Sequence, residues 1–436
     1  KLRQAIERRS RFDGSTRLTP DQDILHGFKF NSLTFAATAG AFVLGGTTDI
    51  GNPQLGLNRM ELEGTAPSIT CSANNDIVVK GPITANAGTN TITVDGTGSL
   101  QVPWIRGASG NVVVKEGSGK LIIYEHADAQ YYAQAASNVA PKIRVNNGTV
   151  EMGTRTGLNN RYVQSGSNWV ADSSQAKCYY EVTVGDGVGA AGSALLKLVD
   201  GGNCLGSKLT INSDGVLDLN GKQRYDTGSA GSVTINGGLL KTGTSSLLMR
   251  DARTLNLNGD ARIEGDASDS IWFYSGSTTN VDATETRAVI ASRSRILAGA
   301  AGPTFNVADK PGDTVALEVT GKMGAANVPS SRLIKNGAGT MLINDYRYTT
   351  GQQTVNEGTL LVSGTVSGTG SWLVNPNGTL GGDGVINSPV TIAGGSLAPG
   401  LSAGILSLGS SLDFQDESTL IWELGMNPTE YDTVEL

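Results

Sequence analysis

Charged residues are scarce in this chain, and their scarcity excludes several classes of protein. Asp, Glu, Lys and Arg make up 17% of the 436 residues, against about 25% in an average soluble domain. Good helix formers are therefore few, and Gly, Thr, Ser, Asn and Val take their place. A formal net charge of −7 provides no concentrated basic surface for phosphates. We therefore expect an all-β protein that does not bind nucleic acid.

Cysteine and histidine are also rare. The three cysteines, Cys71, Cys178 and Cys204, form no C-x-x-C pair and are too few for a disulfide scaffold. Cys178 and Cys204 either pair with each other or remain buried free thiols. The two histidines, His26 and His126, are isolated from any candidate nucleophile. We therefore expect no metal, no cofactor and no catalytic triad.

Long hydrophobic runs are missing. The longest, residues 33–46, is too short to span a bilayer and is interrupted by Ala and Gly. It favours two short strands around a turn of small residues, and we expect no transmembrane segment.

The N-terminus is the one candidate for a helix. Residues 1–12 place Leu2, Ile6 and Arg9 on one helical face and are rich in basic side chains. A basic amphipathic helix can lie on a membrane or a partner, but it more often covers the end of a β structure. We therefore predict a basic helical cap within residues 1–26.

Glycine is abundant, at 59 residues, which is roughly twice the usual frequency of about 7%. Between positions 335 and 363, glycines separate two apolar runs of strand length, Met341–Ile343 and Leu360–Val362. Glycine tolerates positive φ angles, so the chain can turn a corner within one or two residues. Short strands joined by such corners predict a chain that winds.

Six segments repeat this pattern of strand, Asn or Ala, Gly turn and strand. The shared position is occupied in turn by Asn146, Asn212, Asn236, Asn356, Asn375 and Ala393. An Asn there tolerates left-handed geometry, and its amide can stack on the same residue of the next coil. Gly358 and Gly378 are 20 residues apart, and Gly378 and Gly395 are 17 apart, which is the length of one coil of a parallel β-helix.

We therefore predict a parallel β-helix, or solenoid, over residues 27–436, with its most regular repeats at 335–400. The alternative is an array of β-sandwiches, but the expected hairpin signals and linkers are absent. Two stretches, residues 125–140 and 159–180, interrupt the pattern and are predicted to leave the coils as insertions.

The best repeat also carries a family motif. It reads KNGAGTMLI at 335–343, followed by Tyr348, Gly351, Thr354-Val355-Asn356 and Gly358-Thr359-Leu360. This stretch resembles the autotransporter-associated β-strand repeat of bacterial secreted surface proteins, of the form K-x-G-x-G-T-L-x-L, then Y-x-G-x-T-x-V-x-x-G-T-L. A looser copy opens at Lys115. The resemblance implies a right-handed β-helix, export and display at the bacterial cell surface, and it implies no catalytic residues.

Two groups of residues are candidates for function. An acidic cluster, Asp260, Glu264, Asp266 and Asp269 with Arg262 beside it, is the best candidate for polysaccharide lyase or hydrolase chemistry. Polar turns of a solenoid also collect Asp without any site. Four aromatic residues offer stacking surfaces for a carbohydrate or another surface ligand: Tyr131, Tyr132, Trp272 and Tyr274.

The sequence therefore predicts a non-catalytic extracellular structural protein. In this hypothesis a rigid β-helical rod acts as a surface scaffold, an adhesin or the subunit of a filament formed by end-to-end β-stacking. The alternative is a carbohydrate-active enzyme that uses the acidic cluster.

Overall fold

The computed structural model is all-β, and none of the residues that it describes lies in a helix. Those residues are 9–15, 28–44, 60–81, 83–103, 105–124, 141–153, 161–165, 168–172, 180–199, 205–222, 225–226, 231–250, 253–266, 270–282, 286–296, 302–310, 315–324, 331–347, 350–426 and 430–436. Within them, no long apolar helix capable of crossing a membrane occurs. The chain forms two compact units, Lys1–Gln223 and Arg224–Leu436.

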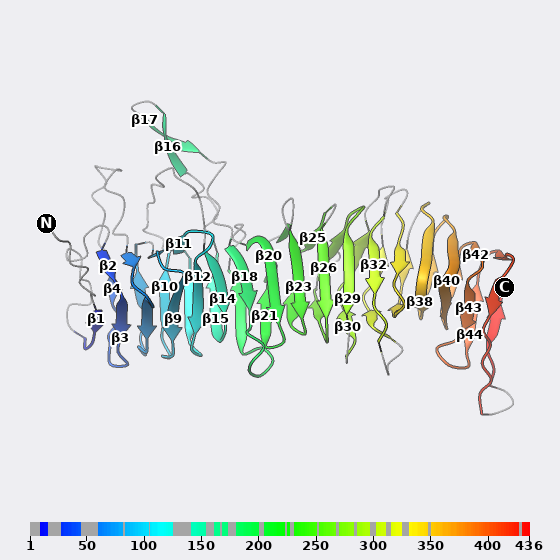
Figure 1. Ribbon diagram of the computed structural model, residues 1–436, viewed down its shortest axis with the longest axis horizontal. Helices are drawn as coiled ribbons and strands as arrows, with labels where there is room; N and C mark the ends of the chain where they lie inside the picture. Colours follow the sequence, from blue (N-terminus) through cyan, green and yellow to red (C-terminus); the bar gives the residue numbers. More distant parts are fainter. Residues whose placement is uncertain are drawn as a thin grey trace. The chain divides into compact units, whose positions relative to one another are not determined.

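Each unit is a stack of coils, and a coil places one strand on each of three faces. On each face, successive strands pair in parallel from one coil to the next, so the sheets run along the stack. In Figure 1 the strands of the second unit, coloured from green to red, stand side by side in this way. The predicted parallel solenoid is therefore confirmed.

In the first unit the chain visits the first, second and third faces in turn. The first face contains β1 (Arg9–Phe12), β3 (Ser32–Phe35), β6 (Ser68–Cys71), β9 (Thr89–Val94), β12 (Val112–Glu116), β14 (Lys142–Val145), β18 (Tyr180–Val184) and β20 (Leu205–Asn212). The second face contains β4 (Val43–Leu44), β7 (Ile77–Val79), β10 (Ser99–Val102), β13 (Lys120–Ile123), β15 (Gly148–Met152), β19 (Ala194–Leu198) and β21 (Gly215–Asp218). The third face contains β2 (Phe28–Phe30), β5 (Met60–Leu62), β8 (Ile83–Ala85) and β11 (Ile105–Gly107).

The second unit repeats the same path. Its first face contains β23 (Ser232–Asn236), β26 (Thr254–Asn258), β29 (Thr278–Asp282), β32 (Thr304–Val307), β35 (Ile334–Asn336), β42 (Val390–Ile392) and β45 (Leu412–Phe414). Its second face contains β24 (Leu239–Lys241), β27 (Arg262–Glu264), β30 (Ala288–Ile290), β33 (Leu317–Val319), β36 (Thr340–Ile343), β43 (Ser396–Pro399) and β46 (Thr419–Leu420). β38 (Gln353–Val362) and β40 (Trp372–Gly382) run from the first face onto the second. The third face contains β22 (Tyr225–Asp226), β25 (Leu247–Met249), β28 (Ile271–Phe273), β31 (Ser294–Ile296), β34 (Met323–Gly324), β37 (Tyr346–Arg347), β39 (Thr365–Ser367), β41 (Val385–Asn387), β44 (Ile405–Leu408) and β47 (Thr433–Glu435).

Antiparallel pairing is rare, so the β-sandwich alternative is wrong. Among the described strands, one antiparallel pair occurs, between β16 (Arg161–Ser165) and β17 (Asn168–Asp172). This hairpin lies in the predicted insertion 159–180. The other predicted insertion, residues 125–140, lies outside the described residues.

The N-terminal helix is not supported where the structure describes it. Arg9–Phe12 is a strand that pairs in parallel with β3, and the Phe12 ring stacks on Phe35 with centroids 5.1 Å apart. Arg9 and Arg11 are exposed, so this segment alternates with the two-residue period of a strand. Residues 1–8, the rest of the predicted helix, lie outside the described residues.

Alternate residues of each strand point into the stack and form its core. In the best repeat, Met341 pairs with Leu360 and Ile343 with Val362, and all four side chains are fully buried. The two apolar runs of the motif are therefore the same strand position in two successive coils. Each coil covers the core of its neighbour, since a single coil cannot bury its own apolar face.

Asparagines form ladders along the first face of the second unit. Asn356 Nδ2 donates to Asn336 Oδ1 at 2.8 Å, and Asn375 Nδ2 donates to Asn356 Oδ1 at 2.6 Å, as the repeat pattern predicts. A second run extends from Asn306 through Asn280 to Asn256, with donor–acceptor distances of 2.9 and 3.0 Å. The bonded residues are 19 to 26 positions apart in sequence.

Two details of the asparagine prediction are wrong. Asn236 pairs with Asn258, and Thr234 is the residue that lies in line with Asn256 and Asn280. Asn236 therefore stands two residues away from the column that leads to Asn356. None of the predicted asparagines has a positive φ; at those corners the left-handed residue is a glycine, such as Gly237 or Gly358.

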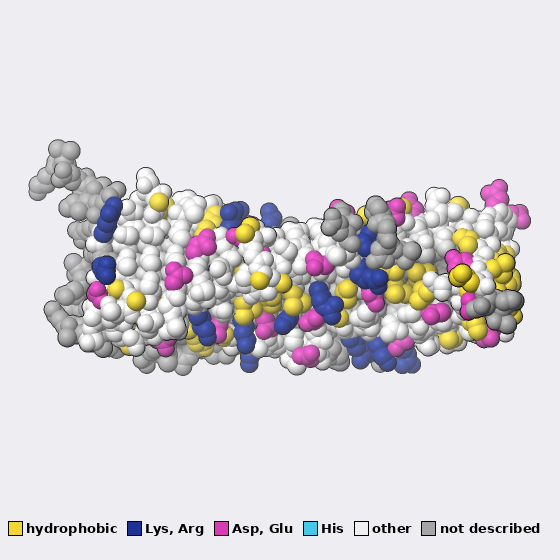
Figure 2. All heavy atoms as spheres, turned by 90° about the horizontal axis from the view of Figure 1, so that it is seen from below, with side chains coloured by type: hydrophobic (Ala, Val, Ile, Leu, Met, Phe, Trp, Pro, Cys, Tyr) yellow, Lys and Arg dark blue, Asp and Glu magenta, His cyan; other side chains and the backbone are white. Residues whose placement is uncertain are grey.

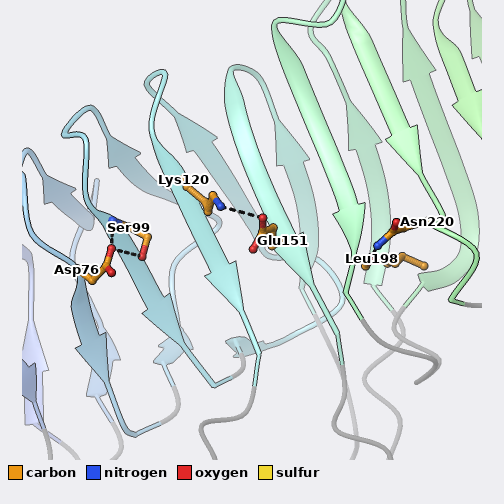
Figure 3. Close-up of polar contacts among 6 residues, drawn as sticks. All are labelled: Asp76, Ser99, Lys120, Glu151, Leu198 and Asn220. Atoms are coloured by element: carbon orange, nitrogen blue, oxygen red, sulfur yellow. Dashed lines mark hydrogen bonds and ion pairs between the residues drawn. The ribbon is translucent and has the colours of Figure 1, made fainter.

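Polar side chains also connect coils on the second face of the first unit (Figure 3). Asp76 accepts hydrogen bonds from the backbone N–H and the hydroxyl of Ser99, both at 2.8 Å, and these bonds lower the pKa of Asp76. Lys120 and Glu151, one coil apart, form an ion pair at 2.9 Å. Polar side chains on the outer surface of this face therefore link neighbouring coils.

The corner glycines give a test of how closely the coils approach. A Cβ atom at Gly358, where φ is +64°, would lie 2.4 Å from the Gly337 carbonyl oxygen. We expect Gly358→Ala to lower the free energy of unfolding by about 2 kcal/mol or more, through strain and clash together. Chemical denaturation followed by circular dichroism measures the change.

The control for this prediction is Gly324→Ala in the same unit. Gly324 has no positive φ, and its Cβ would meet its nearest neighbour, the Arg347 carbonyl oxygen, at an ordinary 3.4 Å. Equal loss of stability in the two variants would contradict a close approach of neighbouring coils at the corner between the first and second faces.

Candidate functional site

Trp272 and Tyr274 lie on the third face of the second unit. Trp272 is the middle residue of β28, between the fully buried Ile271 and Phe273, so its indole points away from the core. The Arg295 guanidinium lies over the Trp272 ring, with Cζ 4.9 Å from the ring centroid. The backbone register explains this contact, because Arg295 of β31 pairs directly with Trp272.

Tyr274 has the same kind of partner. Arg250 follows β25, and its Cζ lies 5.2 Å from the centroid of the Tyr274 ring. A cation over an aromatic face is attracted by the ring quadrupole. One face of each predicted sugar-stacking ring is therefore covered by a guanidinium, and the pair presents positive charge in place of a bare aromatic surface.

More basic side chains occupy the neighbouring coils of this face. Arg293 and Lys322 directly precede β31 and β34, and Arg347 ends β37; all three are exposed. Asp345, which precedes β37, forms an ion pair with Lys322 at 3.4 Å. The basic residues of this part of the third face are therefore Arg250, Arg293, Arg295, Lys322 and Arg347, while Asp251 and Asp269 of the same segments lie outside the described residues.

The acidic cluster lies elsewhere, around β27 on the second face. Asp260 lies in the turn before this strand and Asp266 follows it, so the three residues of β27 separate the two. Arg262 donates from Nε to Glu264 at 2.6 Å, an exposed ion pair of small energetic weight. A catalytic role for Asp260 and Asp266 stays a prediction from the sequence.

Several predicted residues fall outside the described part of the chain. These are Asp269 of the acidic cluster, Tyr131 and Tyr132 of the aromatic group, and the candidate disulfide partners Cys178 and Cys204. Cys71 is a buried free thiol. Within the described ranges, no three His, Cys, Asp or Glu side chains gather closely enough to hold a metal ion.

The motif lysines take a position that the sequence did not indicate. Lys335 is fully buried, and its Nζ donates to the backbone carbonyls of Asn336, Gly337 and Glu357 at 3.1, 2.7 and 2.9 Å. Lys115, in the looser copy of the motif, is also fully buried. Its Nζ donates to three carbonyls of the equivalent corner, those of Glu116, Gly117 and Asn147.

The buried ammonium groups satisfy polar backbone at the corner between the first and second faces. Burial lowers the pKa of each lysine from 10.5 to about 8. Each Nζ lies beneath the backbone that it contacts, which suits a structural role. The glycines of K-x-G-x-G bring the carbonyls together, and the lysine supplies their donors.

The lysine pKa predicts how stability changes with pH. Between about pH 8 and 10.5 the unfolded chain retains a proton that the folded chain has released, so raising the pH favours folding. We expect the wild type to gain stability relative to Lys335→Met over this window, by up to about 3 kcal/mol. Denaturant titrations at pH 7.5 and pH 10 measure the difference.

Met341→Leu, a buried substitution with no titrating group, is the matched control. A difference between wild type and Lys335→Met that stays constant with pH would show that the lysine titrates alike in the folded and unfolded chains.

Comparisons with protein-family models, with curated proteins and with solved structures found no match to this chain. The resemblance of residues 335–400 to the autotransporter repeat therefore stays a prediction based on the motif residues themselves. The interpretation of function rests on geometry, and the two features that carry it are the inter-coil ladders and the buried motif lysines.

Proposed function

We propose that this chain is a non-catalytic structural protein, a β-helical scaffold. The observation that carries the proposal is the use made of its polar side chains. Asn336, Asn356 and Asn375 bond to one another from coil to coil, and Lys335 bonds to backbone carbonyls of its own and the next coil. Such side chains hold coils together and are unavailable for acid–base chemistry.

An extracellular location on a bacterial surface is part of this proposal. Its support is the resemblance of residues 335–400 to a repeat found in exported surface proteins. The right-handed winding implied by the same resemblance agrees with the strong preference for right-handed crossovers between parallel strands. Surface display also suits a chain with few charges and many small polar residues.

Self-association is the second part of the proposal. The coil that contains β46 and β47 exposes large apolar side chains, among them Ile421 at 42%, Trp422 at 56% and Leu424 at 82%. Figure 2 shows hydrophobic side chains gathered at the end of the second unit where Figure 1 draws the C-terminus. Apolar surface of this kind is usually covered by a partner.

Charge favours a second copy of the chain as that partner. Residues 348–436 contain nine acidic residues and no Lys or Arg, whereas residues 1–12 contain five basic residues and one acidic residue. β45 ends the first face of the second unit and β1 begins that of the first unit. Each pairs with one described strand only, on one edge. Parallel addition of β1 to β45 of another copy aligns Arg11 with Asp413 and Phe12 with Phe414.

This head-to-tail contact joins two different edges of the chain, so each added copy leaves an edge to which the next copy can bind. We expect the mass of the wild-type chain in light scattering to increase with concentration. Arg11→Glu and Asp413→Arg should each weaken association about fivefold, because each replaces an attraction by a repulsion. Combining the two substitutions should restore association.

A mass that is independent of concentration would contradict self-association. A double variant that associates no better than the single variants would contradict the contact between β1 and β45. Lys208→Glu, which reverses an exposed charge in β20, at the other end of the first face of the first unit from β1, is the control and should associate like the wild type.

The absence of catalysis is tested separately. We expect no release of reducing or unsaturated ends when the chain is incubated with acidic and neutral polysaccharides. Release that is lost in Asp260→Asn or Asp266→Asn would overturn the non-catalytic proposal and assign the acidic residues to a site.

A further inference from the structure

Six Asn-Gly pairs occur in the chain, and a glycine leaves the preceding asparagine side chain free to approach the next backbone nitrogen. In four of the pairs the asparagine amide is hydrogen-bonded to another coil: Asn220, Asn236, Asn258 and Asn336. A fifth asparagine, Asn377, lies within the continuous strand β40. The sixth, Asn147, lies in the turn between β14 and β15, and its amide has a different partner.

The amide of Asn147 faces its own backbone. Its Oδ1 accepts from the Gly148 N–H at 2.7 Å, and the same N–H donates to the Ser193 carbonyl at 2.8 Å. Because Cγ is bonded to Oδ1, the carbon that a ring closure requires already lies beside the Gly148 nitrogen. Reacting atoms that are held together in this way need little further ordering. Asn147 is also exposed, so a group released from its side chain can leave into water.

Lys115 acts on the same peptide group from below. Its Nζ donates to the Asn147 main-chain carbonyl at 3.0 Å, and the nitrogen of that peptide group is Gly148 N. A cation bonded to the carbonyl oxygen stabilises the negative charge that remains when the Gly148 N–H loses its proton. The lysine therefore favours formation of the nucleophile.

We propose that Asn147 is a modification site at which the chain deamidates without an enzyme. The Gly148 nitrogen gives its proton to water and forms a bond to Cγ of Asn147, and the side-chain nitrogen leaves as ammonia. Water then opens the resulting five-membered ring. The net reaction consumes one water, releases one ammonia and replaces the amide by a carboxyl group, so it needs no other reagent.

The contact with Lys115 also favours one of the two products. Opening of the ring at Cγ gives aspartate, whereas opening at the former main-chain carbonyl gives isoaspartate. The lysine polarises the main-chain carbonyl, and in isoaspartate the carbon of that carbonyl becomes a free carboxylate beside the ammonium group. We therefore expect a larger share of isoaspartate at Asn147 in the folded chain than in the denatured chain.

Asn336 is the matched comparison within the same molecule. Lys335 Nζ donates to the Asn336 carbonyl at 3.1 Å, so this peptide group is polarised in the same way. However, Asn336 Oδ1 accepts from Asn356 in the ladder, and the Gly337 N–H donates to the Glu357 carboxylate. The side chain is therefore held by the next coil, and we expect Asn336 to be protected.

The test incubates the full chain at about pH 7.5, where Lys115 is mainly protonated, and follows both asparagines by peptide mass spectrometry. We expect Asn147 to convert at least about tenfold faster than Asn336 in the folded chain, and the two to convert alike in denaturant. Lys115→Met should slow conversion at Asn147 about fivefold and lower the share of isoaspartate.

Two further variants serve as controls. Asn147→Gln lengthens the side chain, so the five-membered ring cannot form and conversion at this position should cease. Asn356→Ala removes the ladder bond to Asn336 and should accelerate conversion there, while Asn147 converts as in the wild type. Circular dichroism establishes that each variant is folded.

Conversion at Asn147 that is no faster than at Asn336 in the folded wild type would overturn the proposal. An unchanged rate and product ratio in folded Lys115→Met would remove the lysine from the reaction. An unchanged rate at Asn336 in Asn356→Ala would show that the ladder does not protect it, and would contradict the explanation of the difference between the two sites.

Discussion

Parallel hydrogen bonding between successive coils sets the repeat distance of each unit, and the other features depend on it. With neighbouring backbones about 4.8 Å apart on every face, each residue lies directly against its counterpart in the next coil. Groups that tolerate contact with their own kind are therefore favoured where a position repeats. Asn bonds to Asn, and Leu pairs with Leu. At the corner between the first and second faces, Gly358 pairs with Gly378, because a Cβ atom at either position would collide with the backbone of the preceding coil.

Where the chain turns a corner, some backbone carbonyl groups are buried and need hydrogen-bond donors. At the corner after β35, three carbonyl oxygens point toward the core, and the Lys335 ammonium provides a donor for each. Gln353 plays a comparable part nearer the third face. Its amide accepts from Leu333 N–H and the Tyr346 hydroxyl and donates to the carbonyls of Ser331 and Gly351. Both side chains are fully buried, and their hydrogen bonds offset the loss of water.

Much of the architecture could be predicted from the sequence, because each coil of a solenoid repeats a similar pattern of apolar residues and glycines. The runs Met341–Ile343 and Leu360–Val362 were read as strands, and they pair in register. Register between distant repeats was predicted less well. Asn236 and Asn356 precede similar Gly turns, yet their columns differ by two residues, since the strands of the first face shorten between β32 and β35. At the N-terminus, Ile6 and Arg9 favoured a helix, whereas pairing with β3 makes Arg9–Phe12 a strand.

The candidate site was predicted only in part. Trp272 and Tyr274 stand out in the sequence as an aromatic run, and the structure places both on an outer face; their role in binding stays a prediction. Their arginine partners were missed because Arg295 lies 23 residues beyond Trp272, and only the coil register brings the two together. The acidic residues were grouped by proximity in sequence, but an intervening strand separates Asp260 from Asp266.

The asparagine ladders join residues whose sequence separations range from 19 to 26, yet the donor–acceptor distances stay between 2.6 and 3.0 Å. The hydrogen-bond distance between successive asparagines is therefore independent of the number of residues that separate them in the sequence. Loop closure entropy grows only slowly with length, so a coil can gain or lose residues at a corner at little cost. Such a chain can diversify by insertion: new loops change the surface while the ladder continues to align every coil.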